Sequence, residues 1–559
     1  MGRMYNRRAF MAYFAGTGLT TTLMPGALWA RLQQQPQDTI TKEMVKDAEA
    51  LAGLQFTDTE REAIVRGVNS NARSYAQLRT ATINNSVLPA IQFDPVLPSM
   101  TLPSVRKPAR YSKPNRVERP RNIEEIAFWP VLALAELVRA RKVSPVELTE
   151  LYLARLKKHG PTLEAVITLT DQRALKQART AEADIKAGRY KGLLHGIPWG
   201  AKDLLAVKGY RTTWGAKPYE NQMLDEDATV VKRLDDAGAI LVAKLTLGAL
   251  ANGDVWYGGK TKNPWKLDQG SSGSSAGPGA ATVAGLVAFA IGSETLGSIV
   301  SPSTRNGATG LRPTFGRVPR TGAMALSWSM DKLGPMARYV EDLAAIFPAI
   351  IGPDRADPTV RDVPFNWDAA TDIRKLRIGY YKSAFDATEN HATKAFDDAV
   401  LETFRSKLGV NLIPFETPTK LPLNALRIIL NAEAAAAFDD ITRSGAVNTM
   451  QDSSWPNSFR QSRFIPAVEY IQANRIRTLV MQEMAKAMES VDVVVTPSFG
   501  GNILLLTNLT GHPAVVVPSG FNTTDNTPVS ISFVGKLFGE AETLAVAKAY
   551  QDATGFQLK

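Results

Sequence analysis

From Ile126 onward, the sequence alternates between short apolar runs and longer segments with helical periodicity. Short apolar runs bounded by turn residues are typical of buried strands, and strands that alternate with helices indicate an α/β fold with a largely covered sheet. A pair of helices is predicted over 131–158, divided at Ser144-Pro145, because serine caps a helix and proline fits its first turn. The other predicted elements are strands over 165–168, 240–243, 376–380, 491–496, 514–517 and 530–534, helices over 174–187 and 424–441, and an apolar segment over 283–290 that packs on the core.

The first 30 residues have the layout of an export signal. Arg7 and Arg8 precede a moderately apolar run, and Pro25 ends that run before a group of small residues. Paired arginines ahead of a weakly apolar segment are typical of the twin-arginine export route. We therefore expect residues 1–30 to be a cleaved twin-arginine-like signal, the protein to be periplasmic or secreted, and its only membrane contact to be through this signal. An uncleaved anchor and a frayed N-terminal helix are the alternatives.

Residues 31–94 are expected to form a small helical N-terminal region. Helical periodicity extends over 40–82, and the sequence Thr57-Asp58-Thr59-Glu60 favours the start of a helix.

Residues 95–125 contain six prolines, together with a basic run over 105–121 that has seven Lys or Arg and one Glu. This composition predicts an extended connector over the surface. The run accounts for much of the net charge of +11, but its only aromatic residue is Tyr111. Because the basic excess is local and poor in aromatic residues, we expect no nucleic-acid partner.

The chain has no cysteine and only four histidines. The lack of cysteine excludes disulfides, thiolate metal sites and a cysteine nucleophile. The sequence also lacks the metalloprotease and dinucleotide-binding motifs, so we expect neither a metal nor a cofactor.

A glycine- and serine-rich stretch, 270–299, holds several candidate nucleophiles. Its GSSAG pattern matches the nucleophile elbow centred on Ser275. An elbow follows a buried strand and needs a histidine oriented by an acid, whereas this pattern follows glycine and serine. His195 and His512 lie in apolar runs, which are typical of structural histidines. A flexible linker is the other interpretation, but a compact apolar segment follows Gly279.

Lys202 is a candidate base that does not need a histidine. It ends the apolar segment GIPWGAK. Burial lowers the pKa of a lysine because desolvation disfavours its charged form, and a neutral lysine can accept a proton. The alternative is a surface lysine paired with Asp203.

Several motifs, taken in order along the chain, resemble the amidase signature family. They are GIPWGAKD, GSSGSSAG, GSETLGSI, SPSTRNGATGLRPT and DKLGPMAR, followed near the C-terminus by VDVVVTP and NLTGHPAVVVPSG. The resemblance is strong over 126–350, good over 490–555 and poor over 354–480. It implies an amidase signature domain over 126–559, with a large twisted mixed β-sheet covered by helices on both faces. Members of this family are Ser-Ser-Lys amidases, which include peptide amidases and general amidases.

The resemblance also implies a role for individual residues. Lys202 matches the lysine of the family, Ser298 matches the nucleophile, and Ser274, which lies 24 residues before Ser298, matches the relay serine that follows a cis peptide bond. The remaining implied residues are Gly273 and Ser275 as supporting residues, and Thr295, Leu296 and Gly297, whose backbone N–H groups would form the oxyanion hole.

Some positions depart from the usual pattern of the family. Leu296 stands where glycine is frequent, Val300 where arginine is frequent, and Glu294 where aspartate is more usual. These changes bear on the choice of substrate more than on catalysis, because the side chains of the triad are intact. We expect structural roles for Asp331, Arg338 and Asp342, and we regard Trp256, Tyr257, Trp265, Trp328 and Trp455 as core residues that could also line a substrate pocket.

The sequence therefore predicts an enzyme that hydrolyses the C–N bond of a small-molecule or peptide amide through an acyl-enzyme. One alternative is the glutaminase subunit of a tRNA-dependent amidotransferase, against which the export signal argues. The other is an inactive amidase-fold binding protein, against which the intact triad argues. The sequence leaves a homodimer open.

Overall fold

The computed structural model describes residues 40–558 apart from 79, 82, 115–116, 388–392, 419 and 451–452. The signal predicted for residues 1–30 lies outside these described residues. The chain divides into two compact units, residues 1–87 with 463–469 and residues 88–462 with 470–559. In the part of the chain that the structure describes, none of the helices is long and apolar enough to cross a membrane.

The first unit contains the helices α3 (Lys42–Ala52) and α4 (Asp58–Leu78). The helix start predicted at Thr57 is confirmed, because the Thr57 backbone N–H donates to Glu60 Oε2 at 2.6 Å and Thr57 Oγ1 accepts from the Glu60 backbone at 3.3 Å. This reciprocal pair is a capping box. Arg61 on α4 donates through Nε to the buried Glu49 on α3 at 2.7 Å, which fixes the two helices to each other.

The second unit begins with an extended segment. Between residues 88 and 122 the described residues form no helix and only one isolated bridge, Arg110 with Asp368. Arg106 Nη2 lies 2.6 Å from Asp362 Oδ1, and the Ser112 backbone N–H donates to Glu341 Oε1 at 2.6 Å. The basic segment is therefore attached to acidic residues that come more than 200 positions later in the sequence.

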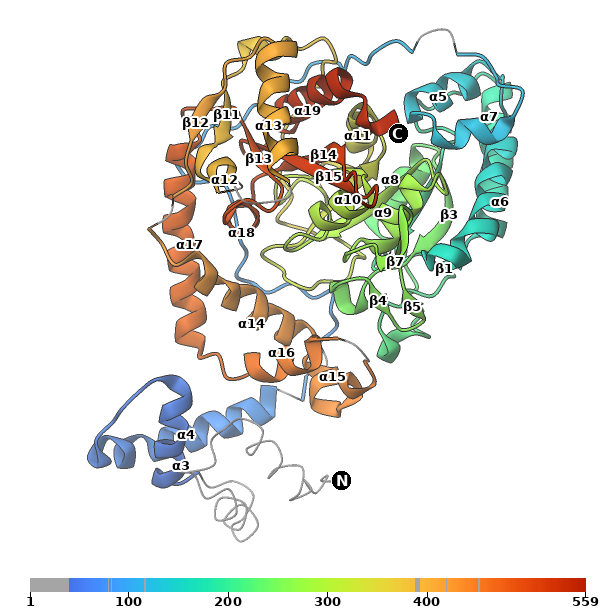
Figure 1. Cartoon of the computed structure of the whole chain (residues 1–559). Helices are drawn as coiled ribbons and strands as arrows, with labels where there is room; N and C mark the ends of the chain where they lie inside the picture. The colour runs from blue at the N-terminus through green and yellow to red at the C-terminus, as the bar shows by residue number, and fades with distance from the viewer. Residues whose placement is uncertain are drawn as a thin grey trace. The chain divides into compact units, whose positions relative to one another are not determined.

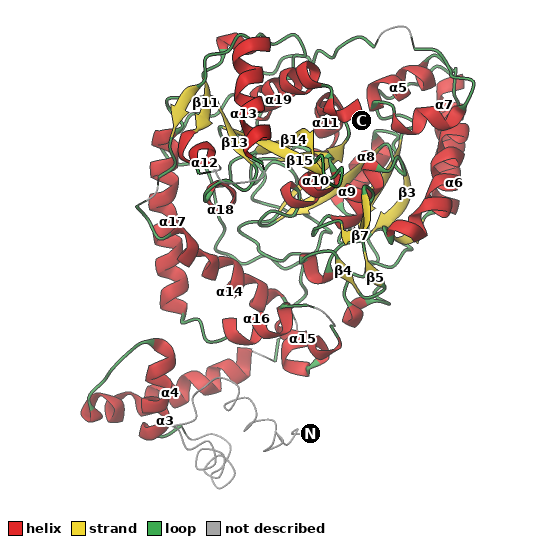
Figure 2. Ribbon diagram, in the orientation of Figure 1, coloured by secondary structure: helices red, strands yellow, loops and turns green. Residues whose placement is uncertain are grey.

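An eleven-stranded mixed sheet forms the centre of the second unit (Figure 2). Pairing is parallel between β3 and β2, β2 and β8, β13 and β11, and β11 and β12, and antiparallel elsewhere. The order is β1 (Val166–Leu169), β3 (Ile240–Leu245), β2 (Pro198–Lys202), β8 (Phe289–Glu294), β10 (Lys332–Ala337), β9 (Thr309–Arg312), β14 (Ala514–Phe521), β15 (Pro528–Gly535), β13 (Val493–Pro497), β11 (Ile378–Tyr381) and β12 (Ile413–Phe415).

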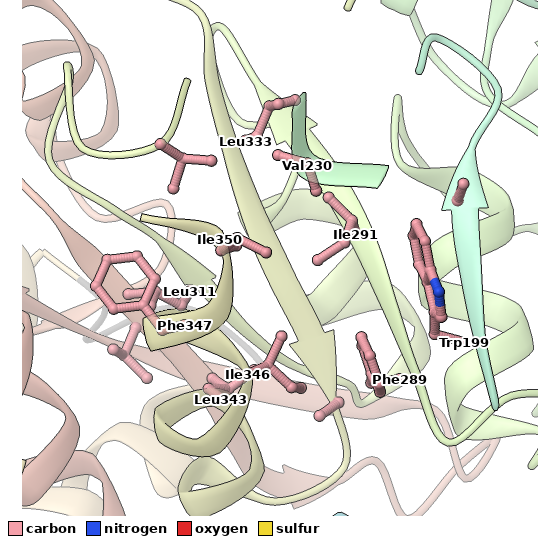
Figure 3. Packing of buried hydrophobic residues seen from close by; sticks show 14 of the residues in the cluster. Trp199, Val230, Phe289, Ile291, Leu311, Leu333, Leu343, Ile346, Phe347 and Ile350 are labelled. Atoms are coloured by element: carbon pink, nitrogen blue, oxygen red, sulfur yellow. The ribbon is translucent and has the colours of Figure 1, made fainter. Parts of the chain in front are cut away.

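Helices pack on both faces of this sheet, so the predicted fold class is confirmed. On one face, Trp199 of β2 and Phe289 of β8 stack and share a core with Phe347 (Figure 3). On the other face, Ile240 and Ala290 share a core with the helices that precede and follow these strands. The first face is covered by α5 (Val131–Arg139), α8 (Thr229–Asp236), α11 (Val340–Ile350) and α19 (Glu540–Thr554), and the second by α6 (Pro145–Leu163), α7 (Asp171–Lys186) and α9 (Ala276–Val283).

The segment with poor family resemblance is mostly helical. Figure 1 shows α14 (Arg427–Ala437) beside α16 (Trp455–Ser462), and these two helices are in contact.

The other helices of the unit are α10 (Val300–Asn306), α12 (Lys382–Asp386), α13 (Lys394–Glu402), α15 (Asp439–Ser444), α18 (Ile503–Thr510) and most of α17 (Ala467–Ala487).

The predicted pair of helices over 131–158 is confirmed as α5 and α6. Ser144 caps α6 through a capping box with Glu147, whose backbone N–H donates to Ser144 Oγ at 3.1 Å. The prediction that the apolar segment 283–290 packs on the core is confirmed, since Leu286, Val287 and Ala290 belong to a buried cluster. This segment contains the end of α9 and the start of β8, and a turn over residues 284–288 joins the two elements.

Candidate active site

Lys202 ends β2, a central strand that pairs in parallel with β3 and β8. Its side chain is fully buried, and Nζ lies 2.8 Å from Ser274 Oγ, 3.0 Å from Ser275 Oγ and 2.8 Å from Ser293 Oγ. Burial lowers the pKa of Lys202 well below its usual value, while the negative charges of Asp331 and Glu294 act in the opposite direction. The alternative, in which Lys202 is a surface residue paired with Asp203, is therefore wrong. Lys202 is buried, and Asp203 pairs instead with Lys244 at 2.7 Å.

The peptide bond between Gly273 and Ser274 is cis, as the family resemblance implies. Gly273 is required there, because a Cβ atom at this position would lie 1.8 Å from the carbonyl oxygen of Gly253. Ser275 follows directly and is fixed from two sides, since its Oγ accepts the Ser293 N–H at 3.0 Å and donates to the Ser293 carbonyl at 3.0 Å.

These contacts argue against the nucleophile elbow at Ser275. The Ser275 hydroxyl is bonded to Lys202 and Ser293, and no histidine is bonded to it within the described residues. The two candidate histidines are held elsewhere. His195 Nδ1 accepts the Lys191 N–H at 3.1 Å, and the buried His512 lies 2.8 Å from Thr510 Oγ1, with burial lowering its pKa to about 3.

Ser298 lies between β8 and α10, at the end of the loop 295–297. Its carbonyl accepts the Ser275 N–H at 3.1 Å, so the backbone joins it to the lysine and serine cluster. Gly297 has φ of +88°, a left-handed conformation that glycine adopts without strain. Over the described residues, no hydrogen bond links the Ser298 hydroxyl to Ser274. Hydrogen bonds between catalytic groups are often long in unliganded enzymes.

The backbone on both sides of Ser298 is fixed by two buried carboxylates. Glu294 Oε2 accepts the backbone N–H groups of Ile299 at 2.8 Å and Val300 at 3.0 Å. Asp331 Oδ1 accepts Thr295 Oγ1 at 2.5 Å, and burial raises the pKa of Asp331. The expected structural role of Asp331 thus includes direct support of the loop that would form the oxyanion hole.

Glu294 is also the centre of a buried ionic network that sequence reasoning did not find. Its Oε1 lies 2.9 Å from Arg312 Nη1 and 2.8 Å from Asn508 Nδ2, and Lys332 Nζ lies 2.7 Å from Asn508 Oδ1. Burial alone would raise the pKa of Glu294, but the charges of Arg312 and Lys332 lower this pKa to about 2. The charged Glu294 inside the motif GSETLGSI was the one sign of this network in the sequence. Its partners could not be identified, because they lie far from Glu294 in the sequence.

Replacing Glu294 with glutamine should destabilise the protein by about 3 to 5 kcal/mol, because it leaves the buried Arg312 without its counter-charge. The thermal unfolding midpoint measures this loss. Glu124→Gln is a matched control, since Glu124 pairs with Arg155 at 2.6 Å but is half exposed, and it should cost about 1 kcal/mol or less. Equal midpoints for the two variants would contradict the prediction.

Two of the tryptophans expected as core or pocket residues donate their indole N–H to a backbone carbonyl, whereas the buried indole nitrogens of Trp256 and Trp328 have no hydrogen-bond partner among the described residues. Trp455 is buried and donates through Nε1 to the Leu250 carbonyl at 3.0 Å. Trp265 donates through Nε1 to the Asn306 carbonyl at 2.7 Å. Arg338, also expected to be structural, donates to the carbonyls of Phe128 and Trp129, each at 3.2 Å. Asp342 is buried, and burial raises its pKa to about 7.

Comparison with known proteins agrees with this geometry. The family model described as Amidase matches residues 147–505. The chain is 33% identical over 477 residues to a protein of Acinetobacter baumannii that is named as a subunit of glutamyl-tRNA(Gln) amidotransferase, covering 76% of this chain and 96% of that protein.

Solved structures lead to the same group. The peptide amidase of Stenotrophomonas maltophilia matches with a TM-score of 0.70 and 29% identity, over 77% of this chain and 98% of that one. An amidase family protein from Bacillus anthracis matches with a TM-score of 0.68 and 26% identity, over 77% and 92% of the two chains. On the motifs, the sheet and these matches together, the chain belongs to the amidase signature family and is a hydrolase of amide C–N bonds.

Proposed function

We propose that the chain hydrolyses a small-molecule or peptide amide through a Ser-cisSer-Lys triad formed by Ser298, Ser274 and Lys202. The observation that carries this proposal is the buried contact of 2.8 Å between Lys202 Nζ and Ser274 Oγ. Burial lowers the pKa of Lys202, which favours the neutral amine whose lone pair can accept a proton.

The first half of the proposed reaction acylates Ser298. Lys202 takes the proton of Ser274 while Ser274 takes that of Ser298, and Ser298 Oγ bonds to the carbonyl carbon of the amide. The negative charge on the carbonyl oxygen is stabilised by the backbone N–H groups of the loop 295–297. The C–N bond then breaks, and the proton stored on Lys202 returns through Ser274 to the leaving nitrogen.

The second half repeats this sequence with water. Water bonds to the acyl carbon while its proton passes through Ser274 to Lys202. The ester bond to Ser298 Oγ breaks, and Ser298 regains the proton. The products are a carboxylic acid and ammonia or an amine, so atoms and protons balance without a cofactor.

A second candidate is the glutaminase subunit of a tRNA-dependent amidotransferase. It is favoured by the name of the Acinetobacter baumannii relative, which aligns over most of both chains. The twin-arginine-like signal proposed for residues 1–30 favours an exported amidase instead, because the amidotransferase works with partner subunits on transfer RNA in the cytoplasm. An inactive binding protein is the third candidate, and the contacts of Lys202 argue against it.

One experiment distinguishes these candidates. The wild-type protein is treated with a fluorophosphonate, digested, and searched by mass spectrometry for a modified peptide that contains Ser298. Ammonia release is measured in parallel from peptide amides, aryl amides, fatty amides and glutamine. The proposal predicts modification at Ser298 and release without any partner protein. Release from glutamine alone, and only after partner subunits are added, would favour the second candidate. An unmodified and inactive protein would favour the third.

A further inference from the structure

The loop 249–254 contains two consecutive residues in the left-handed region of backbone conformation. Leu250 has φ of +49° and Ala251 has φ of +62°. Residues other than glycine rarely adopt this conformation, and two in succession persist only where the surroundings hold them. Both residues are buried, whereas Asn252 and Gly253 are exposed.

This loop supports the residues that precede the proposed relay serine. The carbonyl oxygen of Gly253 lies so close to Gly273 that a Cβ atom there would be 1.8 Å from it. Asp254 Oδ2 accepts the Ser272 backbone N–H at 2.9 Å. A shift of the loop 249–254 would therefore move the backbone directly before Ser274.

The segment around the start of α16 holds the loop in this conformation. Trp455 donates its indole N–H to the Leu250 carbonyl at 3.0 Å, and Asn252 Nδ2 donates to Ser454 Oγ at 2.8 Å. The Trp455 ring is buried and stacks on Phe459, with ring centroids 5.0 Å apart and planes 12° apart. The indole is therefore fixed by packing, and its one polar atom is directed at the strained loop.

We infer that Trp455 is a positioning residue for the relay serine, because its indole N–H sets the loop 249–254 against the residues that precede Ser274. This inference rests on the proposed function, in which Ser274 carries a proton between Ser298 and Lys202. It also assigns a task to the region with poor family resemblance, which contacts the loop 249–254 through this indole hydrogen bond and through Ser454.

The test replaces Trp455 with phenylalanine, which keeps a ring to stack on Phe459 but removes the N–H. A lost hydrogen bond to a buried carbonyl predicts that the second-order rate of Ser298 modification by a fluorophosphonate falls about fivefold. The value of kcat on an amide should fall by the same factor with KM unchanged, because substrate contacts are retained.

Phe459→Leu is the matched control, since it removes the ring on which Trp455 stacks and leaves the indole hydrogen bond. It should lower the thermal midpoint while its modification rate stays within about twofold of the wild-type rate. Ala251→Gly, introduced into the Trp455→Phe protein, should restore part of the modification rate, because glycine adopts a positive φ without strain.

A wild-type modification rate for Trp455→Phe would overturn the inference. So would rates that fall in proportion to the thermal midpoint in both Trp455→Phe and Phe459→Leu, because that result describes a purely structural residue. An unmodified wild-type Ser298 would overturn the proposed function, and this inference with it. If Ser298 of the wild type is modified as expected and Trp455→Phe leaves the modification rate unchanged, only the inference is overturned and the proposed function stands.

Discussion

Replacing Ser298 with alanine should lower kcat for amide hydrolysis by a factor on the order of 10⁴ or more and abolish fluorophosphonate modification. The variant has no atom that can bond to the carbonyl carbon, so the acyl-enzyme cannot form. The residual rate comes from the remaining oxyanion and binding interactions, which still favour attack by water. Because the hydroxyl of Ser298 makes no hydrogen bond to Ser274 within the described residues, folding should be little affected.

Ser301→Ala is the control for this variant. Ser301 lies on α10, one turn after Ser298, and its hydroxyl is 2.7 Å from that of Ser272. In the control variant, the fluorophosphonate should still modify Ser298, and most of the amidase activity should remain. Persistent modification of the Ser298→Ala protein at another serine, with activity retained, would contradict the assignment and move the nucleophile to that serine.

Replacing Lys202 with methionine should lower kcat by a factor on the order of 10² to 10⁴, which is the usual contribution of a general base. Methionine fills a similar volume, and burying a thioether costs less than burying an amine, so the thermal midpoint should not fall. Lys202→Arg should be equally inactive, since a guanidinium stays protonated in proteins. A Lys202→Met protein that kept half of its activity would exclude this lysine as the base.

The pH profile provides an independent check on Lys202. The neutral amine is the active form, and burial lowers its pKa well below the usual value for lysine. As the pH falls through that lowered pKa, Lys202 gains a proton and activity is lost; as the pH rises, the amine is neutral and activity reaches a plateau. The residual activity of Lys202→Met should lack this acidic limb. A wild-type profile that stays flat down to mild acid would contradict the role.

The sequence predicted the strands that consist of continuous apolar runs and missed those that do not. The runs that contain Ile240, Val493 and Val515 are strands of the sheet. The central strands β2, β9 and β10 read PWGAK, TGLR and KLGPMA, with glycine, proline and lysine in positions that usually disfavour a strand. Close packing explains this composition, since a Cβ atom at Gly334 would lie 1.9 Å from the Leu311 carbonyl.

The site could be predicted only in part for a related reason. The resemblance supplied Lys202 and Ser274 in the order in which they occur, and the structure brings them into contact. It did not supply the supporting contacts of Ser293 with Lys202, or of Asn508 with Glu294. Serine and asparagine have no distinctive pattern in sequence, and Asn508 lies 214 positions from Glu294, so only the folded chain relates them.

The place of β14 in the sheet determines when a newly made chain can become active. β14 lies between β9 and β15, and Asn508, which holds Glu294, comes just before it. The ribosome makes Lys202, Ser274 and Ser298 long before these elements. A growing chain therefore carries these three side chains while residues 299–513 are made, but the sheet that contains Lys202 closes only when β14 emerges. We therefore expect hydrolysis only from chains that extend through β14, and a chain cut short before residue 508 should be inert.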